Sequence, residues 1–218
     1  KDLAKLSVIM LLAVIFFGLT GLIIMLFFQW ITLRSYAADA ADKHGISQVS
    51  ASRLGGLAIF ISWVGLMLAG YYNGYLGGKS GGPVGPYWID WFAVGFCAFL
   101  GLAEDLRNNM LSPRFRLYAE LAIFAITIGF WPVLIPTNLG FLGIDALMAV
   151  PVVGWFLTVV FCVGFINAVN MSDGANGLMS GIMTIAYSLF YLNTGEFVYA
   201  AMMTACALFT LFNVISGR

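Results

Sequence analysis

The sequence predicts an all-α integral membrane protein, a polytopic bundle of about seven transmembrane helices. Of its 218 residues, 61% are hydrophobic and only 9% are charged, which is far from the composition of soluble globular proteins. The apolar residues come in runs long enough to cross a bilayer as helices, such as the run from Leu6 to Phe28. Transmembrane β-strands would instead give short segments of alternating hydrophobicity. The continuous runs therefore favour helices and exclude a β-barrel.

The candidate spans follow one another along the whole chain with no visible internal repeat, so we expect residues 1–218 to form a single transmembrane domain. The first apolar run is too long for a signal-peptide core and is followed by no small-residue cleavage site, so it is expected to be a retained span. The spans are expected near residues 6–29, 54–72, 88–103, 117–135, 149–169, 178–193 and 197–215.

Basic residues predict which loops face the cytoplasm. They gather between the first and second spans and between the third and fourth, namely at Arg34, Lys43, Arg53, Arg107, Arg114 and Arg116. Both loops are expected to be cytoplasmic because cytoplasmic loops carry an excess of Lys and Arg. Alternation of the spans then places the amino terminus outside and the polar segment at 170–177 on the cytoplasmic side. Three polar clusters thus converge on one membrane face.

The first polar cluster, residues 167–178, ends the fifth apolar run. It contains Asn167, Asn170, Asp173 and Asn176 together with two glycines. Unpaired carboxylates and amides are costly in hydrocarbon, so such groups usually line a water-filled cavity and bind something. The alternative is a polar turn between two spans, but a turn does not require three Asn and one Asp within ten residues.

The second cluster is the adjacent pair Glu104 and Asp105, where the third span leaves the bilayer. Two neighbouring carboxylates near a low-dielectric wall suit a general base beside a cation site. The alternative is a pair of solvated interface charges balanced by Arg107. The following Ser112-Pro113 is a helix-capping signal. Glu120, in the fourth span, is expected to snorkel or to pair with Arg116 at i,i+4.

The third cluster lies before the second span. Gly55-Gly56 allow close backbone approach, and Lys43 and Arg53 are candidates to hold a phosphate. The alternative is an ordinary positive-inside loop. His44 is the only histidine, so a divalent ion would need oxygen ligands, which suits Mg²⁺, with Mn²⁺ as the alternative. The balanced charge gives no reason to expect a nucleic-acid partner.

Three motifs occur in order: an Asp/Lys loop leading to Arg53-Leu54-Gly55-Gly56-Leu57-Ala58-Ile59, then Gly101-Leu102-Ala103-Glu104-Asp105-Leu106, then the segment from Asn167 to Leu178. Over roughly residues 35–217 the chain resembles the polyprenyl-phosphate N-acetylhexosamine-1-phosphate transferases, whose members initiate peptidoglycan, O-antigen and related envelope polymers. The resemblance implies a bacterial inner-membrane enzyme with a cytoplasmic active site.

The resemblance further implies transfer of sugar-1-phosphate, with an N-acetylhexosamine favoured, from a UDP-sugar to undecaprenyl or another polyprenyl phosphate, releasing UMP. Asn170 matches the family's oxygen ligand for Mg²⁺. Asp105 would activate or position the lipid phosphate, and Glu104 would support the metal environment. Asn167, Asp173 and Asn176 match positions near the nucleotide sugar. Lys43 and Arg53 would bind phosphate, and membrane lipids would surround the spans.

Two departures from the family pattern qualify these expectations. Glu104 stands where the family usually has Asp. The chain also stops at Arg218, before a further acidic motif and further spans of a ten- or eleven-helix fold, so we expect an N-terminal fragment that is inactive alone. Family members are often dimers, so a homodimer is an expectation as well. The competing hypothesis is a transporter or channel segment, but such paths concentrate polar groups near the bilayer midplane.

Overall fold

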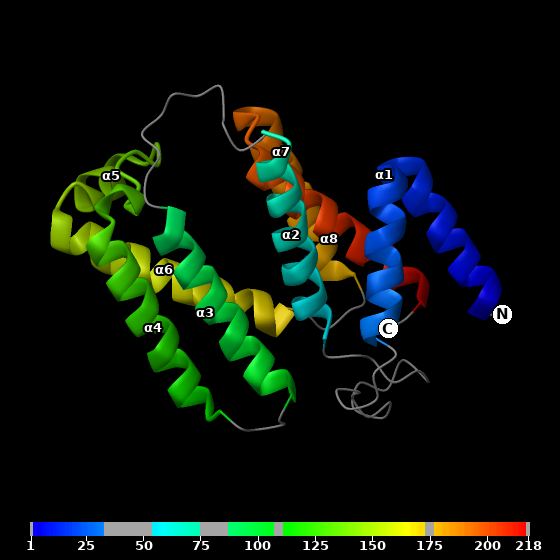
Figure 1. Cartoon of the computed structure of the whole chain (residues 1–218). Helices are drawn as coiled ribbons and strands as arrows, with labels where there is room; N and C mark the ends of the chain where they lie inside the picture. Colours follow the sequence, from blue (N-terminus) through cyan, green and yellow to red (C-terminus); the bar gives the residue numbers. More distant parts are fainter. Residues whose placement is uncertain (1, 33–53, 75–86, 107–110, 173–176, 217–218) are drawn as a thin grey trace. The chain divides into compact units, whose positions relative to one another are not determined.

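The computed structural model describes residues 2–32, 54–74, 87–106, 111–172 and 177–216, and these residues are almost entirely helical. Each predicted span is occupied by a helix, which confirms the all-α prediction. The chain divides into two compact units, residues 1–82 with 173–218 and residues 83–172. The helices are α1 (Asp2–Thr32), α2 (Gly55–Tyr72), α3 (Tyr87–Leu106), α4 (Pro113–Phe130), η3 (Pro132–Leu134), α5 (Leu142–Met148), α6 (Pro151–Ser172), α7 (Leu178–Thr194) and α8 (Phe197–Ser216), as shown in Figure 1.

Four of the described helices are long and apolar enough to cross a bilayer, and they lie at 4–32, 55–72, 151–171 and 197–216. The other three helices that occupy predicted spans are less suited by composition or length. Helices α3 and α4 each carry three charged residues, and α7 has 17 residues. The charges of α3 and α4 lie mainly toward the carboxyl end of α3 and the amino end of α4, where Arg116 is hydrogen-bonded to Glu104.

In the first unit, α8 is the central helix and packs against α1, α2 and α7. Aromatic rings from α1 and α8 meet in its core, where the centroid of Phe28 lies 5.6 Å from that of Phe209 and 6.0 Å from that of Phe212. Gly55 at the start of α2 faces the ring of Phe209, and a Cβ there would lie 2.6 Å from its Cζ. The close approach predicted at Gly55 is therefore made by the ring of Phe209 on α8.

The first apolar run departs from the continuous span that the sequence predicts. Helix α1 is broken at Gly18, whose φ of 60° and ψ of −148° lie outside the helical region (Figure 1). L-residues rarely adopt this conformation, whereas glycine does so freely. Each half is shorter than the roughly 20 residues that span a bilayer as a straight helix. Hydropathy could not reveal the break because the residues on both sides of Gly18 are strongly apolar.

Replacement of Gly18 tests the break directly. Nothing lies within 4 Å of a Cβ built at Gly18, so Gly18→Ala is expected to destabilise only through the backbone, by about 1–3 kcal/mol. Thermal unfolding in detergent measures the effect. Gly65→Ala is the matched control, because Gly65 is helical and also has open space around its Cβ position, and it should be stabilising by about 0.5–1 kcal/mol. Equal effects of the two changes would mean that α1 is continuous in the protein.

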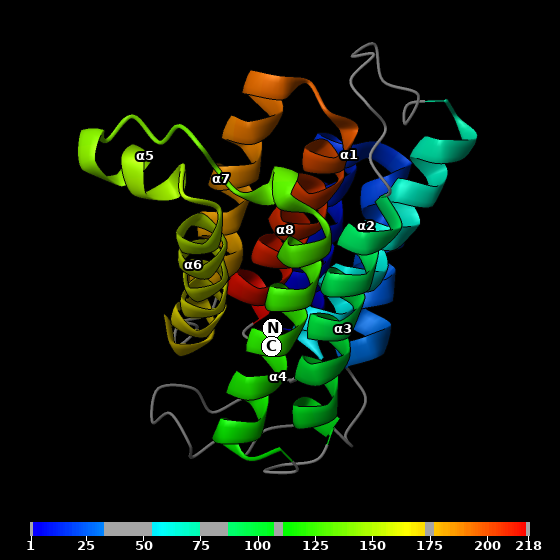
Figure 2. The ribbon, with the colours of Figure 1, turned by 90° about the vertical axis from the view of Figure 1, so that its left-hand side faces the viewer.

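In the second unit, α4 packs against both α3 and α6, and Figure 2 shows α3 and α4 side by side. The predicted cap is confirmed, because the backbone N–H of Phe115 donates to Oγ of Ser112 over 3.2 Å. The fourth span was expected to reach residue 135, but α4 ends at Phe130. Pro132 cannot continue the ladder of backbone hydrogen bonds, and a short 3₁₀ turn follows.

The segment between α4 and α6 lies between two predicted spans and is expected to be a loop, but it contains a further helix. Helix α5 has seven residues, and Oδ1 of its Asp145 accepts a hydrogen bond from the backbone N–H of Leu139 over 2.7 Å. Beyond it, the indole Nε1 of Trp155 on α6 donates to the carbonyl of Ala125 on α4 over 3.1 Å. This bond helps to fix α6 against α4, which matters because the candidate site is built on both helices.

Candidate active site at the ends of α3 and α6

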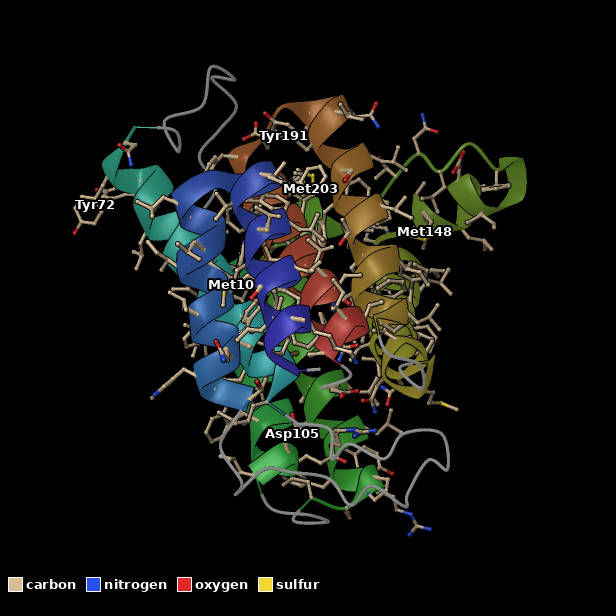
Figure 3. The ribbon with its side chains drawn as sticks, turned by 90° about the vertical axis from the view of Figure 1, so that its right-hand side faces the viewer. Met10, Tyr72, Asp105, Met148, Tyr191 and Met203 are labelled. Carbon is tan, nitrogen blue, oxygen red and sulfur yellow. The ribbon has the colours of Figure 1, made fainter. Side chains whose placement is uncertain are left out.

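The two carboxylates of the second polar cluster lie in the last turn of α3. Glu104 and Asp105 are both half-buried, and Figure 3 labels Asp105 near the end of this helix. Being adjacent in a helix, the two side chains point in directions about 100° apart, since the helix turns once every ~3.6 residues. The two carboxylates therefore face different directions.

Glu104 is paired with α4. Nη1 of Arg116 donates a hydrogen bond of 2.5 Å to Oε2 of Glu104, and the two side chains are 22% and 38% exposed. A guanidinium hydrogen-bonded to a carboxylate at partial burial is stronger than a fully exposed ion pair. The sequence suggests Arg107 as a balancing charge, but Arg107 lies outside the described residues. In the described part of the chain, Arg116 balances Glu104.

Arg116 also approaches a second carboxylate. Its Nε lies 3.8 Å from Oε1 of Glu120, one turn further along α4, so the predicted i,i+4 pair is confirmed. Glu120 is only 5% exposed. A carboxylate with so little access to water requires partners, because an ionised side chain in an apolar surrounding is otherwise very unfavourable.

The second partner of Glu120 comes from α6. Nδ2 of Asn167 donates to Oε2 of Glu120 over 2.6 Å and to the carbonyl of Val163 over 2.9 Å. A continuous polar network therefore runs from Glu104 through Arg116 and Glu120 to Asn167. We call these four residues the α3–α4–α6 network. It ties the acidic end of α3 to the amide-bearing end of α6.

Asn170 lies one turn beyond Asn167 on α6, and its side chain is exposed. Residues three apart in a helix lie on neighbouring parts of one surface. Asn167 is hydrogen-bonded within the network. Asn170 lies nearer the end of the helix and is exposed. The structure therefore gives two of the predicted asparagines different surroundings.

Four of the predicted site residues lie outside the described residues. They are the two phosphate-binding candidates and the two polar residues that follow α6, namely Lys43, Arg53, Asp173 and Asn176. Their roles stay predictions. The structure unites Glu104 with Asn167 through the network and places Asp105 and Asn170 at the helix ends that the network connects.

The hydrogen bond between Glu120 and Asn167 was not predicted from the sequence. These residues are 47 positions apart, and only the packing of α4 on α6 brings them together. Two signals were nevertheless present in the sequence. Glu120 is an acid inside an apolar run, and Asn167 is the first amide in the polar end of another such run. Polar residues within apolar spans generally pair with one another.

The described side chains suit a hard cation only in part. Asp105 and Asn170 offer carboxylate and amide oxygens, which Mg²⁺ prefers. One oxygen of Glu104 already accepts a hydrogen bond from Arg116, so this carboxylate is less suited to direct coordination of a metal ion. Among the described residues no group of three or more His, Cys, Asp or Glu could hold a metal ion. A bound ion would therefore need further ligands from other parts of the protein or from substrate phosphates.

Comparison with known proteins agrees with the motifs. The family model of glycosyl transferase family 4 matches residues 87–218, which include α3, α4 and α6. The chain is 28% identical over 174 residues to a probable undecaprenyl-phosphate N-acetylglucosaminyl 1-phosphate transferase of Bacillus subtilis, a match that covers 78% of this chain and 44% of the relative.

Other relatives are named as a different transferase, the phospho-N-acetylmuramoyl-pentapeptide-transferase. The phospho-N-acetylmuramoyl-pentapeptide-transferase of Listeria welshimeri is 27% identical over 147 residues, covering 62% of this chain and 42% of the relative. That of Desulfotalea psychrophila is 32% identical over 126 residues, covering 52% and 35%. No solved structure matches the chain significantly. The chain spans less than half the length of these relatives.

The family match covers well over half of the chain and contains both described polar clusters, the carboxylates at the end of α3 and the asparagines at the end of α6. It gives no support to the transporter hypothesis. With apolar helices long enough to cross a bilayer several times, the protein is a multi-pass membrane protein. The chain belongs to glycosyl transferase family 4.

Proposed function

We propose that the protein catalyses transfer of a sugar-1-phosphate from a UDP-sugar, with UDP-N-acetylhexosamine as the favoured donor, to a polyprenyl phosphate such as undecaprenyl phosphate. The observation that carries the proposal is the α3–α4–α6 network, because it joins the two helix ends at which the family's acidic and asparagine motifs lie. The family match and the names of the relatives support the same reaction class.

The reaction requires a site that tolerates concentrated negative charge. An oxygen of the lipid phosphate attacks the β-phosphorus of the UDP-sugar, the bond from that phosphorus to the bridging oxygen breaks, and UMP leaves. The product is a polyprenyl diphosphate carrying the sugar. Catalysis of phosphoryl transfer depends mainly on positioning and on stabilisation of this charge. The site residues must therefore align two anionic substrates.

Asp105 is the residue that positions the lipid phosphate and accepts its proton when the phosphate is protonated. Asp105 lies in the last turn of α3, at the end of an apolar run, and there it would meet the lipid phosphate at headgroup depth. Asn170 would offer its amide oxygen to Mg²⁺, with Mn²⁺ as an alternative. The ion would neutralise charge on the diphosphate. Glu104 would act less directly, because its carboxylate is hydrogen-bonded to Arg116 of α4.

The remaining assignments complete the proposal. Asn167 would support the nucleotide-sugar side of the site through its place on α6, and Asp173 and Asn176 would contact the nucleotide. Lys43 and Arg53 would bind phosphate.

The active site would lie on the cytoplasmic face of a bacterial inner membrane, because UDP-sugars are made in the cytoplasm. The product would feed synthesis of an envelope polymer such as peptidoglycan or O-antigen. A homodimer is the proposed assembly.

The test is release of UMP by the complete gene product that contains this chain, purified in detergent. Each UDP-N-acetylhexosamine is supplied with undecaprenyl phosphate and Mg²⁺. We expect UMP only when donor, lipid phosphate and divalent ion are all present, and none after chelation with EDTA. A folded protein that releases no UMP from any of these donors would overturn the proposal. Identification of the lipid product by mass spectrometry distinguishes transfer from simple hydrolysis.

A further inference from the structure

Among the residues whose burial the structure describes, Glu120 is the one charged residue that is buried. Neither the proposed chemistry nor the family motifs assign it a role. It lies two turns into α4, away from the exposed end of the helix. A buried carboxylate is unfavourable unless it is paired and hydrogen-bonded. The partners of Glu120 therefore indicate what it does.

These partners come from two helices and extend to a third. Oε2 accepts from Nδ2 of Asn167 on α6 over 2.6 Å, and Oε1 lies 3.8 Å from Nε of Arg116 on α4. Arg116 in turn donates through Nη1 to Glu104 on α3. Because the two oxygens of one carboxylate face different partners, movement of Glu120 would disturb both sides of the network.

We infer that Glu120 is a positioning residue of the proposed active site, and this inference rests on the proposed function. Glu120 touches neither substrate. It holds Arg116 of α4 in the orientation that pairs with Glu104, the sequence neighbour of Asp105. It also holds Asn167 of α6, which lies one turn before Asn170. In this way a single buried carboxylate sets the spacing between the acidic end of α3 and the asparagine end of α6.

Stability alone does not account for the network. Well-packed apolar side chains in place of a buried ion pair are often as stabilising or more so. What charged and amide partners add is directional bonding, which fixes one turn of α4 against one turn of α6. Misplacement of reacting groups by about 1 Å can lower a rate ~10²-fold, so this fixed register is important for phosphoryl transfer.

The test compares Glu120→Gln with the parent in the complete gene product. The glutamine side chain keeps the size of the glutamate and an oxygen that can accept from Asn167, but it loses the charge that faces Arg116. We expect kcat for UMP release to fall by about 10–100-fold, as for other residues that orient a site from behind, while KM for the UDP-sugar changes by less than about threefold. Thermal unfolding of each purified variant gives the folded fraction, to which kcat is normalised.

Thr127→Val is the matched control. Thr127 is a buried polar residue on the same helix, and its Oγ1 has no hydrogen-bond partner among the described residues. The change alters the core of α4 without touching the network, so kcat should remain within about twofold of the parent. Arg116→Met completes a double-mutant cycle with Glu120→Gln. If Glu120 acts through Arg116, the double variant will lose little more activity than Arg116→Met alone.

Three outcomes would count against the inference. If the parent is active and Glu120→Gln keeps kcat within about twofold, the range expected of a neutral change, Glu120 is not a positioning residue and the proposed function stands. If kcat falls only in proportion to the folded fraction, the role of Glu120 is structural and the inference is again wrong. If the folded parent releases no UMP, the proposed function and the inference fail together.

Discussion

Asp105→Asn is expected to lower kcat for UMP release by about 10²–10⁴-fold, the usual contribution of a positioned acid or base. The amide keeps the size of the side chain and its half-buried place at the end of α3, but it can neither accept a proton nor carry a negative charge. The measurement is Mg²⁺-dependent UMP release by the complete gene product in detergent. Membrane insertion and folding should be unchanged, because the substitution is nearly isosteric.

Asp145→Asn is the matched control for this experiment. It makes the same chemical change within the same unit, and the asparagine side chain retains an Oδ1 that can accept from the backbone N–H of Leu139 as Asp145 does. Its kcat should stay within about twofold of the parent. Near-parental turnover by Asp105→Asn would show that the role assigned to Asp105 is wrong, and equal losses in both variants would point to a general effect of removing charge.

Asn170→Ala has the second large expected effect. If the amide oxygen is a ligand for Mg²⁺, its removal should reduce UMP release by at least about 100-fold at low Mg²⁺ and shift the Mg²⁺ concentration for half-maximal activity upward. Asn170→Asp keeps an oxygen at the same place, so it should retain more activity than Asn170→Ala. The side chain is exposed, so neither change should unfold the protein.

Asn73→Ala serves as the control for Asn170→Ala. Asn73 is also an exposed asparagine at the end of a helix, where its Nδ2 donates to the carbonyl of Ala69 over 2.7 Å. Its loss should change stability slightly and leave the Mg²⁺ dependence of UMP release unaltered. A parental Mg²⁺ titration for Asn170→Ala would exclude Asn170 as a ligand while leaving the assignment of Asp105 intact.

The sequence predicted most of the helices because the information that specifies them is local. Apolar runs indicate α2, α6 and α8 to within a few residues, and Ser112-Pro113 marks the start of α4. The errors also have local causes. Pro132 ends α4 earlier than hydropathy suggests, and the short α5 lacks the length of a span.

The sequence predicts candidate residues for the site but only part of their contacts. The motifs indicate Glu104, Asp105 and Asn170 as candidates because the family pattern depends on residues close together in the sequence, and the roles of these residues stay predictions. The pairing of Arg116 with Glu120 was also predictable, since residues four apart in a helix are neighbours. The bond from Arg116 to Glu104 bridges two helices and required the structure.

By itself, the sequence determined that this protein is a helical membrane protein with polar motifs at the ends of its apolar runs, because composition and short spacing depend only on neighbouring residues. Only the tertiary structure decided that Glu120 and Asn167 are hydrogen-bonded to each other and that α1 is broken at Gly18. The bond joins residues far apart in the chain and depends on how α4 packs on α6. The break depends on one backbone conformation that hydropathy does not encode.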